Sequence, residues 1–289
     1  MNSTTNTIAL GAATVSIINT GDVRLVLAEI TNAPESAWRP HYTGIFDQPL
    51  FFPSQCVHIA LPDASVMVDA NDFAISTPPD SPYAPPPDYQ PPPDLLAQLL
   101  MRGIRPENIT HLLITHAHFD HYAGITRLRD GRYVPSFPYA RCFLGRADWE
   151  YPETQEALRD PNSADSRTFG VLQQAGLLEL VEGDRDLTPA VSIIAAPGES
   201  PGHQIVRVSS EGQTLYCLGD LYHHPAEVEH PSWMSVWDDV TTNVASRLAL
   251  VEAALAENAL LVAAHIPGIG RLERTGTGVR WIEIQSANT

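Results

Sequence analysis

One short stretch constrains this chain more than any other. Within six positions it places three imidazoles and a carboxylate, in the run Thr115-His116-Ala117-His118-Phe119-Asp120-His121. The run follows an apolar strand, residues 112–114, and precedes a predicted helix that carries Ile125 and Leu128. In an extended segment that leaves a strand, side chains at i and i+2 can converge on one ion, and the turn into a helix aims the next two at a neighbouring point. Imidazole nitrogens and carboxylate oxygens suit Zn, and also Mn, Fe or Co. The spacing therefore predicts a metal site, with room for two adjacent ions.

The charged residues narrow the classes of function. All 17 basic residues are arginine, against 34 acidic residues, which gives a formal net charge of -17. A chain without lysine cannot form a lysine Schiff base or a Walker-type phosphate loop. So negative a surface also disfavours binding to a nucleic acid or to anionic lipid. We expect a small substrate without negative charge, no nucleic-acid partner and no membrane partner.

Length and cysteine content bear on organisation. The 289 residues, 44% of them hydrophobic, suit one large domain over 1–289. The three cysteines are far apart and form no CxxC pair, as expected of buried free thiols in a reducing compartment. The first twenty residues contain neither a basic residue nor a long apolar run. A cytoplasmic protein is expected.

Residues 78–93 contain nine prolines in sixteen positions, with Tyr83 and Tyr89 between them. Such a segment can form neither a helix nor a central strand, so it predicts a stiff, extended surface loop. The loop could be inert, could bind a partner, or could form a wall of the active site. We hypothesise that it shapes the rim of a substrate pocket.

The remaining pattern alternates strands with helices. Strands are predicted at 14–19, 23–30, 56–61, 65–69, 111–115, 191–195, 204–208, 214–218 and 260–263. Helices are predicted at 94–102, with Asp94 as the cap, and at 148–159, 168–175 and 241–256. In the last helix, Val244, Leu248, Val251 and Leu255 are expected to face the core. Two sheets enclosed by helices would satisfy this order.

The histidine-rich run resembles the signature of the metallo-β-lactamase fold hydrolases. That resemblance implies an α/β fold, an αββα sandwich of two mixed β-sheets flanked by helices. It also requires three further ligands in order, and the chain has a candidate for each. These are His203 in a Pro-Gly-His turn, Asp220 in a Gly-Asp pair after a strand, and His265 before Pro267 and Gly268. The resemblance spans roughly residues 56–271.

Carried over residue by residue, the resemblance implies a centre of two divalent ions, with zinc expected and Mn, Fe or Co as alternatives. His116, His118 and His203 would hold the first metal, and Asp120, His121 and His265 the second, with Asp220 as the bridge. The family's chemistry is attack on a carbonyl by a hydroxide shared by the two metals. Asp120 could in addition relay a proton to the leaving oxygen.

The ligand set separates branches of the family. The commonest class B β-lactamases have cysteine where Asp220 stands, and flavodiiron proteins have glutamate where His118 stands and add a flavin domain. Residues after the bridge, 221–225 and 230–233, resemble the lactonase and methyl parathion hydrolase branch. The prediction is therefore an enzyme that opens lactones of the acyl-homoserine type. Organophosphate or aryl-ester hydrolysis is the alternative, ahead of a glyoxalase II-like thioesterase.

Two other classes stay open: an iron-dependent oxidoreductase with the same ligands, and a metal-binding protein without turnover. Related hydrolases often pair, so the resemblance also allows a homodimer.

Residues that contact substrate are harder to choose. Small lactonases place a tyrosine three residues after the bridging aspartate, where this chain has His223, with Tyr222 one position earlier. Either side chain could polarise the substrate carbonyl. The apolar walls of the pocket are expected to set specificity. The candidates are Phe119, Trp149 and Trp233, together with Phe46, Phe51 and Phe52.

Overall fold

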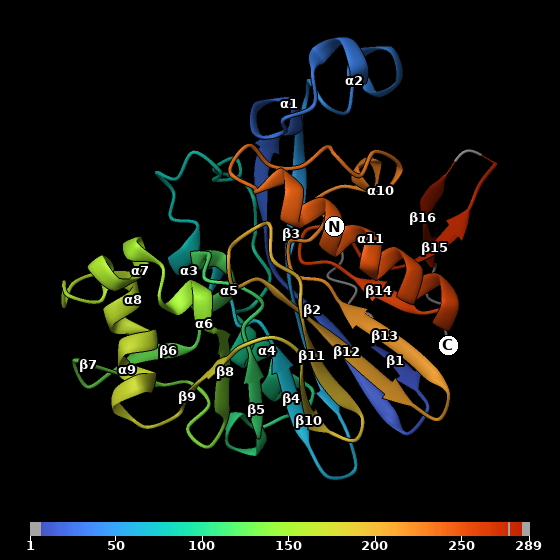
Figure 1. Ribbon diagram of the computed structural model, residues 1–289. Helices are drawn as coiled ribbons and strands as arrows, with labels where there is room; N and C mark the ends of the chain where they lie inside the picture. Colours follow the sequence, from blue (N-terminus) through green and yellow to red (C-terminus); the bar gives the residue numbers. More distant parts are fainter. Residues whose placement is uncertain (1–6, 277, 285–289) are drawn as a thin grey trace.

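Two seven-stranded sheets lie face to face with helices on their outer sides (Figure 1). The structure is a computed structural model, and it describes residues 7–276 and 278–284. The first sheet has the order β1-β2-β3-β4-β5-β8-β9 and the second β10-β11-β12-β13-β14-β15-β16. Both sheets contain parallel and antiparallel pairs. The predicted αββα sandwich of two mixed sheets is confirmed.

The strands of the first sheet are β1 (Thr7–Leu10), β2 (Ala13–Val26), β3 (Pro49–Ala60), β4 (Ser65–Val68), β5 (His111–Leu113), β8 (Arg141–Gly145) and β9 (Leu178–Val181). Those of the second are β10 (Arg185–Thr188), β11 (Val191–Ala195), β12 (Gln204–Ser210), β13 (Gln213–Cys217), β14 (Leu260–Val262), β15 (Ile269–Arg274) and β16 (Val279–Ile284). A separate hairpin joins β6 (Thr126–Arg129) to β7 (Arg132–Pro135).

The core between the sheets is formed by the side chains on one face of each strand, because successive side chains point to opposite faces. In β13, Leu215 and Cys217 face the other sheet, whereas Tyr216 packs beneath the helix on the outer face. In β12, Val206 likewise faces the other sheet and Ile205 faces the helices on the outer side. Because side chains in a strand point to opposite faces in turn, a sheet covered on both sides needs apolar residues at nearly every position. This explains the nearly continuous apolar runs in the sequence.

The helices cover the outer faces (Figure 1). Those packed near the first sheet are α4 (Leu95–Met101), α5 (Phe119–Tyr122), α6 (Arg146–Trp149), α7 (Pro152–Ala157), α8 (Ala164–Arg167) and α9 (Phe169–Gln174). On the second sheet lie α10 (Ala226–Glu229) and the long α11 (Val240–Glu257). As predicted, the Asp94 side chain caps α4, accepting the N–H of Ala97 at 2.8 Å. The remaining short elements are α1 (Leu27–Ile30), α2 (Glu35–Tyr42), α3 (Phe73–Ser76) and η1 (Pro106–Asn108).

The face that α11 buries differs from the predicted one. Leu248, expected in the core, is 52% exposed, while Arg247 beside it is fully buried. The buried stripe of the helix is Asn243, Arg247, Leu250, Val251 and Ala254. A hydrophobic pattern alone cannot find this stripe, because two of its members are polar: Asn243 donates to Asp238, just before the helix, and Arg247 donates to segments farther away.

Three local predictions were also wrong. Residues 27–30 form helix α1 and do not extend the strand before them. The helix expected around Ile125 and Leu128 ends at Tyr122, and Leu128 stands 63% exposed in strand β6. Residues 148–159 form parts of two short helices, with the break just before Pro152. A residue that precedes proline is disfavoured in helical geometry, which explains that break.

The proline-rich segment 78–93 contains neither helix nor strand, as predicted. It is tied down through its tyrosines: the Tyr83 carbonyl accepts the N–H of Arg24 at 2.8 Å, and the Tyr89 hydroxyl donates to Asp22 at 3.0 Å. The Tyr89 ring also stacks on Phe51, with ring centroids 6.3 Å apart. The segment therefore lies along β2 and β3.

Within the described parts of the chain, none of the helices combines the length and the apolar character that crossing a bilayer requires.

Candidate metal centre

The histidine-rich run and the three downstream candidates meet at one end of the sandwich. Residues 115–121 leave the end of β5, and His203 immediately precedes β12, in the connection from β11. Asp220 follows β13 and His265 follows β14. Close approach is possible because Gly219 has φ +53°, and a Cβ there would lie 2.7 Å from the Thr115 side chain. Parallel pairing of β4 with β5, and of β13 with β14, brings these strand ends to a common edge.

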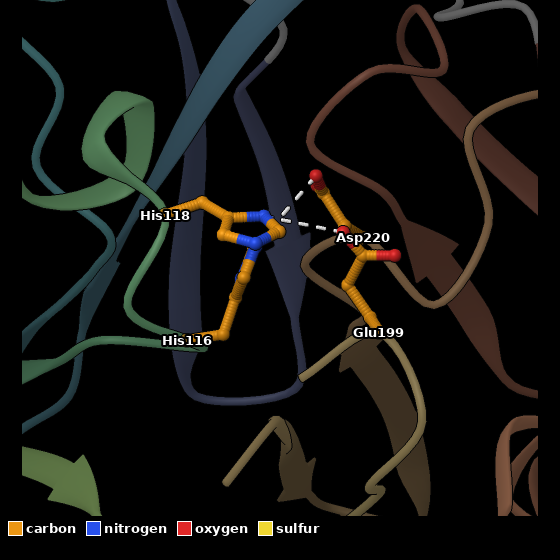
Figure 2. Close-up of side chains that lie close together, drawn as sticks. All are labelled: His116, His118, Glu199 and Asp220. Carbon is orange, nitrogen blue, oxygen red and sulfur yellow. Dashed lines mark ion pairs between the residues drawn. The ribbon is translucent and has the colours of Figure 1, made fainter. Parts of the chain in front are cut away.

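A first group of possible ligands joins both sheets. It consists of His116, His118, Glu199 and Asp220, whose ligand atoms all lie within 4.8 Å of one another. Figure 2 shows the two imidazoles on one side and the two carboxylates facing them. His118 Nδ1 lies 3.2 Å from Glu199 Oε1, and His116 Nε2 lies 3.8 Å from Asp220 Oδ2.

A second group adjoins the first through Asp220. It consists of Asp120, His121 and His265. His265 Nε2 lies 3.3 Å from one oxygen of Asp120 and 3.3 Å from Asp220 Oδ2, while Asp220 Oδ1 lies 3.3 Å from His121 Nε2. One carboxylate thus faces both groups, as the sequence predicted for a bridging ligand.

The donor atoms of these groups suit cations. His116 Nε2, His121 Nε2 and Asp220 Oδ1 are buried and have no hydrogen-bond partner among the residues that the structure describes. An unpaired buried polar atom costs about 1–3 kcal/mol, so folded proteins rarely leave three together. Bound divalent ions would satisfy all three. The residues present therefore fit the two-metal centre that the resemblance implies.

The outer ring nitrogens are held by the protein. His265 Nδ1 lies 2.8 Å from the Pro53 carbonyl oxygen, His203 Nδ1 lies 3.0 Å from that of Ala196, and His121 Nδ1 lies 2.9 Å from Asp69 Oδ2. Such contacts fix the tautomer and aim the other nitrogen at the metal. His203 departs from the prediction in one respect: its Nε2 accepts the N–H of Asp220 at 3.3 Å, and it belongs to neither ligand group.

Electrostatics keep the central carboxylates ionised. Burial raises the pKa of Asp220, but the imidazoles of His121, His265 and His223 lower it more, so its pKa lies well below its ordinary value. Burial likewise raises the pKa of Asp120, and His121 and His265 bring it down to about 2. Burial lowers the pKa of His116 well below its ordinary value. Anionic carboxylates and a neutral imidazole are the forms that bind metals.

Sequence reasoning missed two supporting carboxylates. Asp69, at the end of β4 with φ +56°, accepts the N–H and the hydroxyl of Thr115 at 2.8 and 2.9 Å and also contacts His121. Asp148 accepts the N–H groups of Ala117 and Gly202 at 2.9 and 2.6 Å, which ties the histidine-rich run to the loop of His203. The only signal for Asp69 was its place at a strand end, since no motif includes it.

Replacing Asp69 by asparagine is expected to weaken metal binding at the group that contains His121 by about 10- to 100-fold, the usual cost of losing a supporting partner. The amide nitrogen would face the His121 ring where a carboxylate now stands, so the ring would lose its orientation. Calorimetric titration of the metal-free variant with zinc measures the change. As a control, Asp186→Asn alters an exposed carboxylate on β10 and should leave both affinities unchanged. An Asp69→Asn protein with wild-type affinities would contradict this role.

A cavity of about 370 Å³ opens over both ligand groups. His118, Asp120, Asp220 and His265 form its polar side, and Val23, Leu25, Ile30, Phe52, Phe119 and Trp237 form most of its apolar side. Of the predicted contacts, Phe119 and Phe52 line it. Trp149 packs in the core under the first sheet, and Trp233 packs in a cluster with Phe46. Trp237 was not predicted, because no pattern marks a tryptophan in a loop.

The structure also separates Tyr222 from His223. Tyr222 is 1% exposed, and its ring lies under the guanidinium of Arg247 at 4.7 Å, within the core beneath α11. His223 lines the cavity, and its Nε2 lies 3.2 Å from Asp220 Oδ2. Of the two, only the imidazole faces the ligand groups.

Comparison with known proteins supports the resemblance. The family model described as the metallo-beta-lactamase superfamily matches residues 89–265, more than half of the chain. A curated N-acyl homoserine lactonase of Bacillus cereus is 26% identical over 126 residues, and that match covers 43% of each chain. A second, from a Bacillus species, is 24% identical over 132 residues, 45% of this chain and 46% of that one. The chain thus matches less than half the length of these curated relatives.

Solved structures share the fold over nearly the whole chain. The hydrolase AbOPH of the beta lactamase superfamily has a TM-score of 0.80 at 16% identity, with both chains covered in full. AidC, a dizinc quorum-quenching lactonase in complex with an N-hexanoyl-L-homoserine product, has a TM-score of 0.76 at 20% identity, with 98% of each chain covered. At such identities these structures show the fold alone. Together with the matched family model, the two ligand groups and the sandwich place this chain in the metallo-beta-lactamase superfamily.

Proposed function

We propose that this protein is a metal-dependent hydrolase that opens lactones of the acyl-homoserine type. The observation that carries the proposal is that Asp220, a member of the first ligand group, lies 3.3 Å from His121 and His265 of the second and lines a largely apolar cavity. His116, His118, His203 and Asp220 would hold one ion, and Asp120, His121, His265 and Asp220 the other, with zinc as the expected metal. Two such ions supply a hydroxide nucleophile at neutral pH and polarise an ester carbonyl.

The protein's own groups have distinct tasks around that chemistry. Asp220 joins the two ligand groups, because its Oδ2 lies 3.8 Å from His116 Nε2 of the first group and 3.3 Å from His265 Nε2 of the second. Asp120 is 30% exposed at its side chain and lines the cavity, so its ionised carboxylate can take the proton of the hydroxyl that has added to the carbonyl carbon and pass it to the oxygen that leaves when the ring opens. His223 can donate a hydrogen bond from Nε2 to the carbonyl oxygen of the substrate.

The cavity supports a substrate with a polar reacting group and an apolar tail. Phe52, Phe119 and Trp237 offer aromatic surface beside the ligand groups, while arginine is absent from the described residues that line the cavity. An anionic substrate would meet no arginine there, which disfavours thioesters of acidic peptides. An acyl-homoserine lactone is neutral and carries such a tail. The lactonase names of the relatives and the product bound to AidC point the same way.

The direct test is proton release by purified, zinc-loaded protein with homoserine lactones of several acyl lengths, beside an aryl phosphotriester and a simple aryl ester. Lactone opening should be the fastest reaction, and it should disappear in His116→Ala. If lactones are inert and the triester or ester is cleaved, the substrate class passes to organophosphate or aryl-ester hydrolysis. Inert substrates throughout, with both metals bound, would refute the hydrolase proposal.

The proline-rich loop is expected to influence acyl-chain binding. Tyr83 lines the cavity and is 44% exposed, so an alanine there removes apolar contact while the backbone bond from Arg24 stays. Losing about 40 Å² of contact corresponds to about 1 kcal/mol, or about a fivefold rise in KM for long-chain lactones with little change in kcat. Tyr139→Ala, at a tyrosine 73% exposed, is the control. Equal KM values for Tyr83→Ala and wild type at every acyl length would show that the loop does not contact the acyl chain.

A further inference from the structure

Glu199 occupies a place in the first ligand group that the sequence comparison with the family did not assign. It lies in the connection between β11 and β12, four residues before His203, and is 3% exposed. Its Oε1 lies 3.2 Å from His118 Nδ1 and accepts the indole N–H of Trp237 at 2.8 Å. The carboxylate is therefore aimed at the nitrogen through which His118 belongs to the ligand group.

The imidazole of His118 is the one partner of opposite charge that the described residues give Glu199. The other buried glutamate at this end of the sandwich, Glu227, pairs with the buried guanidinium of Arg247 at 2.8 Å. Among the residues that the structure describes, no arginine pairs with Glu199. Burial and Glu199 raise the pKa of the adjoining Asp238 to about 10, so this carboxyl is neutral and brings no positive charge. When His118 is neutral, as a metal ligand must be, the buried carboxylate is left without a cation, and an unpaired buried charge costs about 3–5 kcal/mol.

The positions of the other donors indicate where the missing charge belongs. The ligand atoms of Glu199, His116, His118 and Asp220 lie within 4.8 Å of one another, as metal ligands do around one ion (Figure 2). His116 Nε2 in this group has no partner among the described residues. A cation placed between these atoms would satisfy that nitrogen and balance the carboxylate together.

We propose that Glu199 is a ligand of the metal ion held by His116 and His118. This proposal rests on the metal centre of the proposed function and adds to its chemistry. With Glu199 added to His116, His118, His203 and Asp220, the first subsite would offer two carboxylates beside its three imidazoles instead of one. Carboxylate oxygens suit Mn²⁺ better than imidazoles do, so the added oxygen narrows the preference of this subsite for Zn²⁺ over Mn²⁺.

The test compares metal binding by wild type and Glu199→Gln. Glutamine keeps the size of the side chain and an oxygen for the Trp237 N–H, but it removes the charge. Metal-free proteins are titrated calorimetrically with ZnCl₂ or with MnCl₂, bound metal is counted by mass spectrometry, and bound Mn²⁺ is followed by its electron paramagnetic resonance spectrum. In Glu199→Gln, the Mn²⁺ affinity of one site should fall at least tenfold and its Zn²⁺ affinity should fall less. The affinity of the other site should not change.

Two further variants serve as a control and as a charge-conserving comparison. Glu153→Gln removes an exposed carboxylate from a neighbouring cavity of about 810 Å³ that Glu199 also lines, and it should bind both metals as wild type does. Glu199→Asp keeps the charge, so it should retain more Mn²⁺ affinity than Glu199→Gln, and it replaces that variant if Glu199→Gln does not fold.

The outcomes separate this proposal from the proposed function. If Glu199→Gln binds both metals with wild-type affinity and an unchanged Mn²⁺ spectrum, Glu199 is not a ligand, although the hydrolase proposal stands. Equal weakening in Glu199→Gln and Glu199→Asp, with Zn²⁺ affected as much as Mn²⁺, would likewise overturn it. If wild type itself binds no metal, the proposed function is refuted, and the proposal for Glu199 is refuted with it.

Discussion

Replacing Asp220 by alanine is expected to lower kcat/KM for lactone opening by about a thousandfold or more and to reduce the bound metal below two ions per chain. Asp220 faces both ligand groups, with Oδ2 3.8 Å from His116 Nε2 in the first and Oδ1 3.3 Å from His121 Nε2 in the second. Without it, neither ion is held in position against the other. Metal catalysis contributes several kcal/mol, and each 1.36 kcal/mol changes the rate tenfold, which gives the expected magnitude.

Metal content and kinetics are measured on the same preparation of each variant. Asp220→Asn keeps the shape of the side chain but not its charge, and it should fall between alanine and wild type in metal content. Asp80→Ala, at an exposed aspartate of the proline-rich loop, is the control for loss of a carboxylate. Wild-type turnover with two metals in Asp220→Ala would show that Asp220 does not bridge the centre.

Replacing Arg247 by methionine is expected to lower the free energy of unfolding by about 3–5 kcal/mol, the usual cost of breaking a buried ion pair. Arg247 is fully buried and donates to the carbonyls of Leu221 and Trp233 at 2.8 and 2.5 Å and to the Glu227 carboxylate at 2.8 Å. Glu227 in turn accepts the N–H of His223 at 3.0 Å. The pair thus holds the segment after Asp220 against helix α11.

Urea unfolding followed by circular dichroism measures this effect. Arg280→Met, which breaks an exposed pair with Glu273, should cost about 1 kcal/mol or less. Arg247→Met combined with Glu227→Gln removes both charges and should recover part of the loss, because no buried charge is then left unpaired. A loss below about 1 kcal/mol in Arg247→Met would mean that the buried pair does not stabilise the fold.

The sequence predicted the parts of this molecule that local pattern controls. Apolar runs broken by Gly, Asp and Pro located most strands of both sheets, and Asp94 located the start of α4. The spacing of His116, His118, Asp120 and His121 predicted a ligand cluster before any fold was known. In both cases the determining contacts lie within a few residues of the signal.

The parts that were missed depend on contacts between distant segments. The buried face of α11 includes Arg247 because its partners come from helix α10 and from loops, 14 to 26 residues away. Asp69 reaches His121 across 52 positions. Trp237 joins the cavity through a loop that is tied to the segment just after α1, where Asn32 and Met234 pair. No periodicity in the sequence records such pairings, so only the folded structure reveals them.

Turnover is expected to depend on two metal ions held around Asp220. To test this, zinc is added stepwise to metal-free protein while lactone opening is followed in the same cell. We expect no turnover in the metal-free protein and a rise that is complete at two equivalents per chain. Full turnover without metal, or a plateau at one equivalent, would contradict it.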